Sequence, residues 1–322
     1  MSMILRTLAV AALALSAGAG GAQPLNVLFY GNSFTLGFGS TRSVNAVFQD
    51  IATAAGHETP LAQSAAASGQ TLNWHLNNNT NPIFTLIPPG RDWDYIVLQE
   101  HSTKFTQAFA ESPPYPQSIE QSKADAVGLY DRATDRSPNV TPILYETWAR
   151  GPGHEFYTGP NPLYSGPSEM QAEIRSGYQS LKQAIDESVG SDLALIAPVG
   201  DAWENANYDQ LHANDLWHAQ NRGTLLAALV IYGTAYGDPT TSDIDLSGVL
   251  ASMNLTAADG AFLTAAADRT LAPVPEPASI SAVVGGCIAF GCLKSRPRCR
   301  NGTSPCVARR RGCRVRRAWR PN

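Results

Sequence analysis

Residues 26–36 read NVLFYGNSFTL, and this stretch decides the fold. Its first five residues form a nearly continuous apolar run, which is typical of a strand buried on both faces of a parallel sheet. Gly31 and Asn32 then favour a tight turn. Ser33 follows the turn directly, so the sequence predicts an exposed serine hydroxyl at the carboxyl end of the strand.

Similar apolar runs recur along the chain. YIVLQ at 95–99 and LALIAPV at 193–199 predict strands, as does PILYETW within 141–148, and 60–65 predicts a weaker one. Helical spacing is found over 44–55, 118–132, 168–189, 221–236 and 255–267. Apolar strands that alternate with helices predict one α/β domain, a three-layer α/β/α sandwich with a parallel sheet. Ligands of such sheets bind beyond the carboxyl ends of the strands.

Two terminal segments do not follow this alternation. Residues 1–22 combine Arg6, a short apolar run and small residues, which together predict a secretory signal peptide. Residues 273–322 contain VPEPAS, an apolar run at 280–293 and a basic tail. This order resembles a PEP-CTERM sorting signal. The resemblance implies a secreted or cell-surface protein, transient membrane contact through 280–293 and an exosortase-type enzyme as partner. The alternative for the tail is a disordered or nucleic-acid-binding arm.

The net charge of −4 conceals an uneven distribution. Residues 294–322 hold 11 of the 23 basic residues and none of the 27 acidic ones, so 23–293 carries a net charge of −16. The negative charge of residues 23–293 argues against nucleic-acid binding. All five cysteines lie at position 287 or beyond, which excludes a disulfide scaffold, a cysteine enzyme and a zinc–cysteine site from residues 23–272, called the body below.

A serine hydroxyl becomes a nucleophile when a general base removes its proton. His218 is the best candidate, because DLWH at 215–218 places Asp215 three residues before it. That carboxylate can accept the Nδ1 proton and fix the imidazole tautomer. The alternative is that Asp215 caps the following helix beside a surface histidine. Asp201, after the strand at 193–199, is a rival for the acidic role.

Together these sequence motifs resemble those of the SGNH (GDSL-like) hydrolase family. The resemblance rests on VLFYGNSFTLG, SGQTLNWHL, YIVLQEHS and DLWHAQNRGTLLAALVIYG, and it covers roughly 24–270. It implies a flavodoxin-like sandwich over a domain at 23–272. It also implies a serine esterase in which Ser33 attacks, His218 is the base and Asp215 orients it. The reaction is expected to use no cofactor, and no metal is assigned.

The family stabilises the oxyanion with a glycine after the second strand and an asparagine after the third. Gly69 fits the position of the glycine after the second strand, and its backbone N–H is predicted to bind the oxyanion together with that of Ser33. No Gly-x-Asn follows 95–99, where QEHS stands instead. Gln99 is therefore predicted to donate its amide N–H, with Ser102 as the reserve. The alternative is that Gln99 pairs inside the sheet edge.

Substrate contacts are predicted for Asn32, Glu146 and Trp217, although Glu146 has a purely structural alternative. His101 is expected to support the site without touching substrate. The family resemblance implies an acylated carbohydrate or other small ester, with acetyl esters favoured. One alternative is a non-catalytic surface protein that binds glycans, which the missing Gly-x-Asn favours. Another is a lipid-directed esterase or lipase, which the acidic body without a long apolar lid disfavours.

Overall fold

The computed structural model describes residues 23–110 and 113–272 of the chain. The predicted signal peptide at 1–22 and the predicted sorting segment at 273–322 lie outside the described residues. Among the residues it does describe, no helix combines the length and apolar character required to cross a bilayer.

A five-stranded sheet forms the centre of the domain. Its strands are β1 (Asn26–Tyr30), β2 (Leu61–Ser64), β3 (Tyr95–Leu98), β4 (Thr141–Tyr145) and β5 (Leu195–Ala197). The spatial order is β2-β1-β3-β4-β5, and every neighbouring pair is parallel. All five residues of β1 are buried, as expected for the middle of a covered sheet. The predicted parallel α/β sandwich is confirmed.

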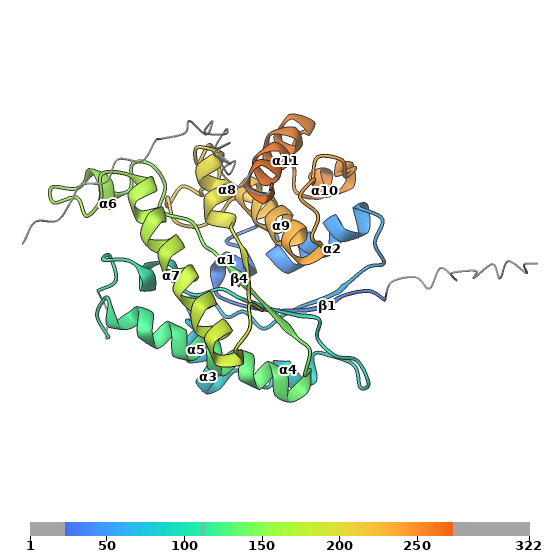
Figure 1. Ribbon diagram of the computed structural model, residues 1–322. Coiled ribbons are helices and arrows are strands. Elements are labelled where there is room, and N and C mark those ends of the chain that lie inside the picture. The colour runs from blue at the N-terminus through green and yellow to red at the C-terminus, as the bar shows by residue number, and fades with distance from the viewer. Residues whose placement is uncertain (1–22, 111–112, 273–322) are drawn as a thin grey trace, which may run out of the picture. The chain divides into compact units, whose positions relative to one another are not determined.

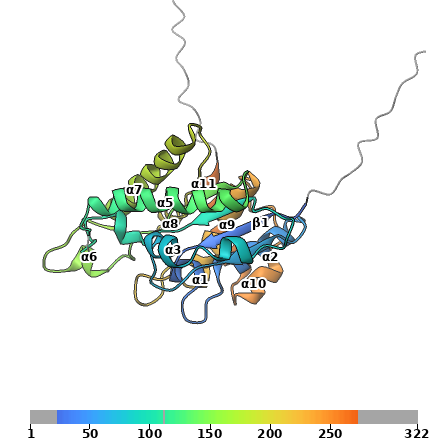
Figure 2. The ribbon, with the colours of Figure 1, turned by 90° about the horizontal axis from the view of Figure 1, so that it is seen from below.

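Helices cover both faces of this sheet (Figure 1). One layer contains α3 (Leu72–Asn78), α4 (Pro82–Thr85), α5 (Gln117–Arg136) and α7 (Pro167–Val189). The other contains α1 (Ser33–Leu36), α2 (Val44–Ala54), α8 (Val199–Asn205), α9 (Asn221–Tyr236), α10 (Ser247–Ser252) and α11 (Ala257–Leu271). The short α6 (Glu155–Thr158) and the 3-10 turn η1 (Ser102–Phe105) belong to loops. Figure 2 shows α5 and α7 lying side by side, in agreement with their contacts.

The five predicted helices are all present, with ends shifted by at most four residues. The short helices α3, α4, α6, α8 and α10 were not predicted, because one or two turns are too few to establish a helical period. The strand predicted within 141–148 ends at Tyr145, and the run predicted as strand to residue 199 already turns into α8 at Val199. Apolar runs alone do not distinguish a strand end from a buried helix start.

The strand order determines where a ligand can bind. β1 pairs with β2 on one side and with β3 on the other, so the chain reverses its direction of winding between them. A crevice opens at the carboxyl ends of the strands at such a switch point. The residues that follow β1, β2 and β3 therefore face a common space, and Ser33 is among them.

Candidate active site

Ser33 is the first residue of the one-turn helix α1, directly after the turn that ends β1. Asn32 caps this helix, because its Oδ1 accepts from the Phe34 N–H at 3.1 Å. The Phe34 ring stacks on Trp148 with centroids 4.4 Å apart, and Trp148 stacks on Trp203 at 4.0 Å. This three-ring stack anchors α1 in the core and holds the Ser33 hydroxyl in place.

Three side chains form a continuous chain of hydrogen bonds. Ser33 Oγ lies 2.9 Å from His218 Nε2, and His218 Nδ1 lies 2.7 Å from Asp215 Oδ2. The structure thus brings together residues that are 185 positions apart in the sequence. Serine, imidazole and carboxylate have the connectivity of a nucleophile, a general base and its orienting group.

Asp215 is bound in a way that keeps it ionised. Its Oδ1 accepts from the backbone N–H groups of Trp217 and His218, both at 2.9 Å. Burial raises the pKa of Asp215, but hydrogen bonds from His218 and Trp217 outweigh this effect and hold the pKa below its ordinary value. The cap residue of α9 is Gln220, and Asp201 pairs with Arg175. The geometry therefore favours Asp215 as the partner of His218.

The imidazole of His218 is held between aromatic rings. Phe38 stacks on it with centroids 4.0 Å apart and planes 7° apart, and Trp217 stacks at 5.2 Å. Phe34 adds an edge contact at 5.7 Å. These contacts leave the His218 side chain only 13% exposed. They restrict the ring to the plane in which Nε2 faces Ser33.

A pocket of about 200 Å³ opens beside these groups. It is lined by Asn32, Ser33, Phe34, Ser68, Gly69, His101, Ser102, Trp217 and His218. The N–H groups of Ser33 and Gly69 have no acceptor among the described residues. Gly69 has φ of +71°, a conformation that favours glycine. Two free backbone donors beside a serine nucleophile can bind a developing oxyanion.

Gln99 does not lie where the sequence predicted. It is fully buried and does not line the pocket. Its Nε2 donates to the carbonyl of Glu100 at 2.7 Å, and its Oε1 accepts from the Asn32 N–H at 2.8 Å and from Thr35 Oγ1 at 3.0 Å. Both ends of the amide are engaged, so this geometry disagrees with the prediction that Gln99 donates to an oxyanion.

Gln99 instead holds the turn that carries Ser33. Gly31 permits this close approach, since a Cβ at position 31 would come within 2.4 Å of Gln99 Oε1. The carbonyl of Gly31 accepts from His75 Nε2 at 2.8 Å, while His75 Nδ1 contacts the Asn79 amide. The turn is thus bound from two sides, by Gln99, whose structural alternative in the sequence analysis agrees with this geometry, and by His75, whose role the sequence patterns did not indicate.

The three residues predicted to contact substrate lie in different surroundings. Asn32 lines the pocket, but its side-chain amide is bound to Gln70 O at 3.3 Å and its carbonyl caps α1. Trp217 is at the pocket rim and is 37% exposed. Glu146 is buried away from the pocket and accepts from Gln171 Nε2 at 2.8 Å. Of these three residues, Trp217 is therefore the one whose exposed side chain can contact a substrate.

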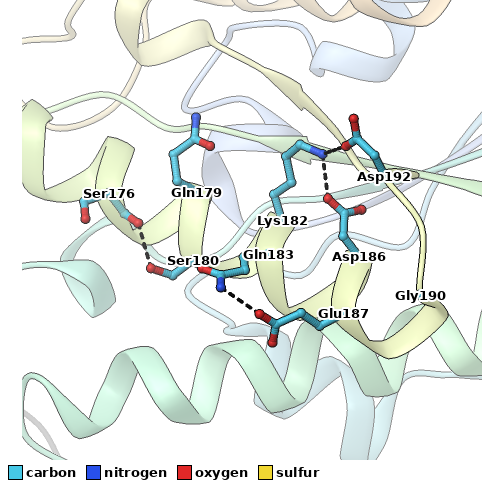
Figure 3. A pocket seen from close by; sticks show the side chains of 9 residues that line it. All are labelled: Ser176, Gln179, Ser180, Lys182, Gln183, Asp186, Glu187, Gly190 and Asp192. Carbon is cyan, nitrogen blue, oxygen red and sulfur yellow. Dashed lines mark hydrogen bonds and ion pairs between the residues drawn. The ribbon is translucent and has the colours of Figure 1, made fainter.

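A larger hollow lies elsewhere, along α7 and the loop after it (Figure 3). Its side chains are already paired with one another, as Lys182 contacts both Asp186 and Asp192, and Gln183 donates to Glu187. No nucleophile–base pair lies there. In the part of the chain that the structure describes, no cluster of three histidine, cysteine or acidic side chains has the arrangement of a metal site.

Replacing Gln99 with leucine tests the structural role of this residue. The substitution leaves the buried Asn32 N–H and the Thr35 hydroxyl without an acceptor, so we expect the free energy of unfolding to fall by about 1–3 kcal/mol. Urea denaturation measures this change. The exposed Gln183→Leu is the matched control and should change stability little. Unchanged stability in Gln99→Leu would contradict the role assigned here.

Glu146 gives a pH-dependent prediction. Burial, then the charge of Asp201 and a hydrogen bond with it, raises the pKa of Glu146 well above its usual range. The folded state thus holds a proton that the unfolded chain releases above about pH 4.5, so wild-type stability is lost as pH rises. Glu146→Gln keeps the hydrogen bonds without the ionisation.

We therefore expect the free energy of unfolding of Glu146→Gln, relative to that of wild type, to increase as the pH rises from about 5 to about 8. The increase should be roughly 1.4 kcal/mol for each unit by which the pKa of Glu146 is raised within this pH range. Urea denaturation at both pH values measures the difference. Glu204→Gln, at a partly exposed partner of Arg175, is the control. A stability difference that does not vary with pH would show that Glu146 is ionised in the folded protein.

The known proteins to which this chain is similar share its fold. No protein-family model matches the chain, and no curated protein matches it either. A protein provisionally named as an SGNH hydrolase, from Slackia heliotrinireducens, is 23% identical over 66% of this chain and 98% of that one, with a TM-score of 0.43. An acetylxylan esterase from Geobacillus stearothermophilus is 15% identical over 66% and 94%, with a TM-score of 0.45. A lipase from a goat rumen metagenome is 12% identical over 66% and 98%, with a TM-score of 0.46.

Proposed function

We propose that this chain is a serine esterase of the SGNH type, with Ser33 as nucleophile, His218 as general base and Asp215 as the group that orients it. The observation that carries the proposal is the continuous chain of contacts, 2.9 Å from Ser33 Oγ to His218 Nε2 and 2.7 Å from His218 Nδ1 to Asp215 Oδ2. This connectivity activates a hydroxyl that is otherwise a weak nucleophile near neutral pH.

The reaction proceeds in two halves. Ser33 Oγ attacks the ester carbonyl as its proton passes to His218 Nε2, and a tetrahedral oxyanion forms. His218 then gives the proton to the leaving alcohol, which departs as the acyl-serine forms. In the second half, His218 takes a proton from water, the resulting hydroxide attacks the acyl group, and the proton returns to Ser33. Asp215 stabilises the imidazolium in both halves.

The N–H groups of Ser33 and Gly69 bind the oxyanion in this scheme. Both residues line the same pocket, and their N–H groups lack an acceptor within the described residues, so they can form hydrogen bonds as negative charge develops on the substrate oxygen. Because they belong to the backbone of a capped helix and of a tight turn, they are already oriented before the substrate binds.

The pocket supports a small acyl group. Its volume of about 200 Å³ is below the ~300–1,000 Å³ typical of sites for drug-sized ligands. The exposed rings of Trp217 and Phe38 flank His218 and offer apolar faces to the alcohol part of the ester. An acetylated carbohydrate fits this combination better than a long-chain lipid ester does, because sugar rings stack on aromatic faces.

Hydrolysis of p-nitrophenyl esters tests the assignment. We expect Ser33→Ala and His218→Ala to lower kcat by about 10⁴-fold or more, and Asp215→Asn by about 10⁴-fold through loss of the correct tautomer. The acetate should be a better substrate than the octanoate, because the pocket is small.

Asp201→Asn is the matched control for Asp215→Asn, since Asp201 pairs with Arg175 and not with His218. It should keep wild-type kcat. A wild-type protein without esterase activity that still binds acetylated sugars would contradict the enzyme proposal and favour a glycan-binding protein. Faster turnover of the octanoate would favour a lipid-directed esterase.

We also propose that the protein is exported. The sequence of 1–22 supports a cleaved signal peptide, and VPEPAS at 274–279 with the apolar run at 280–293 supports sorting by an exosortase-type enzyme. Expression of the full chain in a bacterium with such an enzyme, followed by mass spectrometry of the exported protein, should find an N-terminus at residue 23 and loss of the basic tail. Retention of an intact chain in the cytoplasm would contradict export.

A further inference from the structure

The side of the pocket formed by the residues after β3 is not explained by the triad or by the two backbone donors. His101 and Ser102 line this side of the pocket that Ser33 also lines. Gln99, the other polar residue after β3, is committed to the Asn32 N–H and cannot reach the pocket. If a third donor serves the oxyanion, the described residues place His101 or Ser102 in position to supply it.

The imidazole of His101 is held in one orientation. Its Nδ1 lies 3.0 Å from Thr103 Oγ1, and its backbone N–H donates to Glu100 Oε1 at 2.7 Å. The Trp217 ring meets it in an edge contact, with centroids 6.2 Å apart. Nδ1 is thereby engaged within the 3-10 turn η1, and Nε2 is the ring nitrogen that has no partner among the described residues.

The surroundings of His101 keep it neutral. Burial, reinforced by the positive charges of Arg150 and Lys104 and by His218, lowers the pKa of His101 to about 4. A neutral imidazole carries one N–H. When the Thr103 hydroxyl donates to Nδ1, that N–H is on Nε2. Such a group can donate a hydrogen bond to an oxyanion without giving up its proton.

The charges around His101 also suit an anionic transition state. Arg150 is buried, with its guanidinium over the Trp217 ring at 4.5 Å and its Nη1 donating to Ser102 Oγ at 3.0 Å. Lys104 is buried in η1. No carboxylate within the described residues forms an ion pair with either cation. The carboxyl groups that act on these cations are Glu100, whose pKa is raised by burial, and Asp215, which is bound to His218. Positive charge behind neutral donors favours negative charge on the substrate oxygen.

We propose that His101 is a catalytic residue that donates its Nε2–H to the oxyanion, as a third donor beside the N–H groups of Ser33 and Gly69. This inference rests on the proposed esterase function and adds the residue that completes its oxyanion site. Thr103 is the positioning residue, because its hydroxyl holds Nδ1 and can donate to it, the arrangement in which the N–H of His101 is on Nε2. No proton is transferred through His101, since donor and acceptor keep their bonds while the charge develops and disappears.

Ser102 is the rival donor. Its Oγ accepts from Arg150 Nη1 at 3.0 Å, which leaves its own proton able to point into the pocket. His101 is favoured, because its ring is held by Thr103 on one side and by Trp217 on the other, whereas a serine hydroxyl rotates freely.

Four variants and one inhibitor test the proposal, and one of the variants, Ser102→Ala, removes the rival donor. His101→Leu removes the donor, His101→Gln returns an N–H near the position of Nε2, and His57→Asn changes a histidine that instead contacts Tyr232. We expect His101→Leu to lower kcat by about 10²-fold or more at nearly constant KM, as for other lost oxyanion donors. His101→Gln should recover about tenfold of this loss, and His57→Asn should behave like wild type.

Phenylboronic acid supplies the second readout, because it forms a tetrahedral anionic adduct with a serine nucleophile and so resembles the transition state. Its inhibition constant should rise in His101→Leu by about the same factor as kcat/KM falls. A change of fold alone would not produce this proportionality together with rescue by glutamine.

The alternative outcomes are distinct. Wild-type kcat in His101→Leu, with wild type active, would overturn the role of His101 and leave the proposed esterase function intact. Equal losses in the leucine and glutamine variants would assign His101 to pocket shape and overturn its role as donor. A loss confined to Ser102→Ala would assign the donor to Ser102. An inactive wild-type protein would overturn both the esterase function and this inference.

Discussion

The hydrogen bond from the Asn32 N–H to Gln99 Oε1 is the contact on which the site depends. It joins the turn after β1 to the end of β3, the two strands that flank the switch point of the sheet. Gly31 makes the contact possible, because any side chain there would displace the glutamine. His75 binds the same turn from the other helical layer through the Gly31 carbonyl. The position of the Ser33 hydroxyl thus follows from buried contacts made before any substrate arrives, which is the preorganisation that the proposed reaction requires.

The base is held by different means. His218 reaches Ser33 from the loop between α8 and α9, whose backbone is held by an isolated antiparallel bridge between His212 and Ala219 and not by the central sheet. Its ring is instead packed against Phe38 and Trp217, and its Nδ1 is bound by Asp215. Stacking restricts the plane of the imidazole, and the carboxylate selects its tautomer. The exposed faces of Phe38 and Trp217 are also the surfaces that the substrate would meet, so the rings that orient the base can serve as its binding platform.

The strands can be predicted from their continuous apolar runs and the long helices from their helical period, and the spacing of three residues pairs Asp215 with His218. Gln99 was misplaced by the same reasoning and His101 was undervalued; both follow β3. The composition of QEHS does not say which polar side chain turns inward, since that is decided by the space at Gly31, more than sixty residues away. Glu146 was expected near the substrate because a strand ends there. Its backbone continues to pair with Ala197 and Gly200, which directs the side chain to Gln171 in α7.

The central claim is that Ser33 is the nucleophile and that its reactivity depends on His218. Treatment of the folded protein with a fluorophosphonate, followed by digestion and peptide mass spectrometry, tests it most directly. We expect one covalent adduct, located on Ser33, that forms at a greatly reduced rate in His218→Ala. An adduct on a different serine, or equally fast modification of Ser33 in the absence of His218, would contradict it.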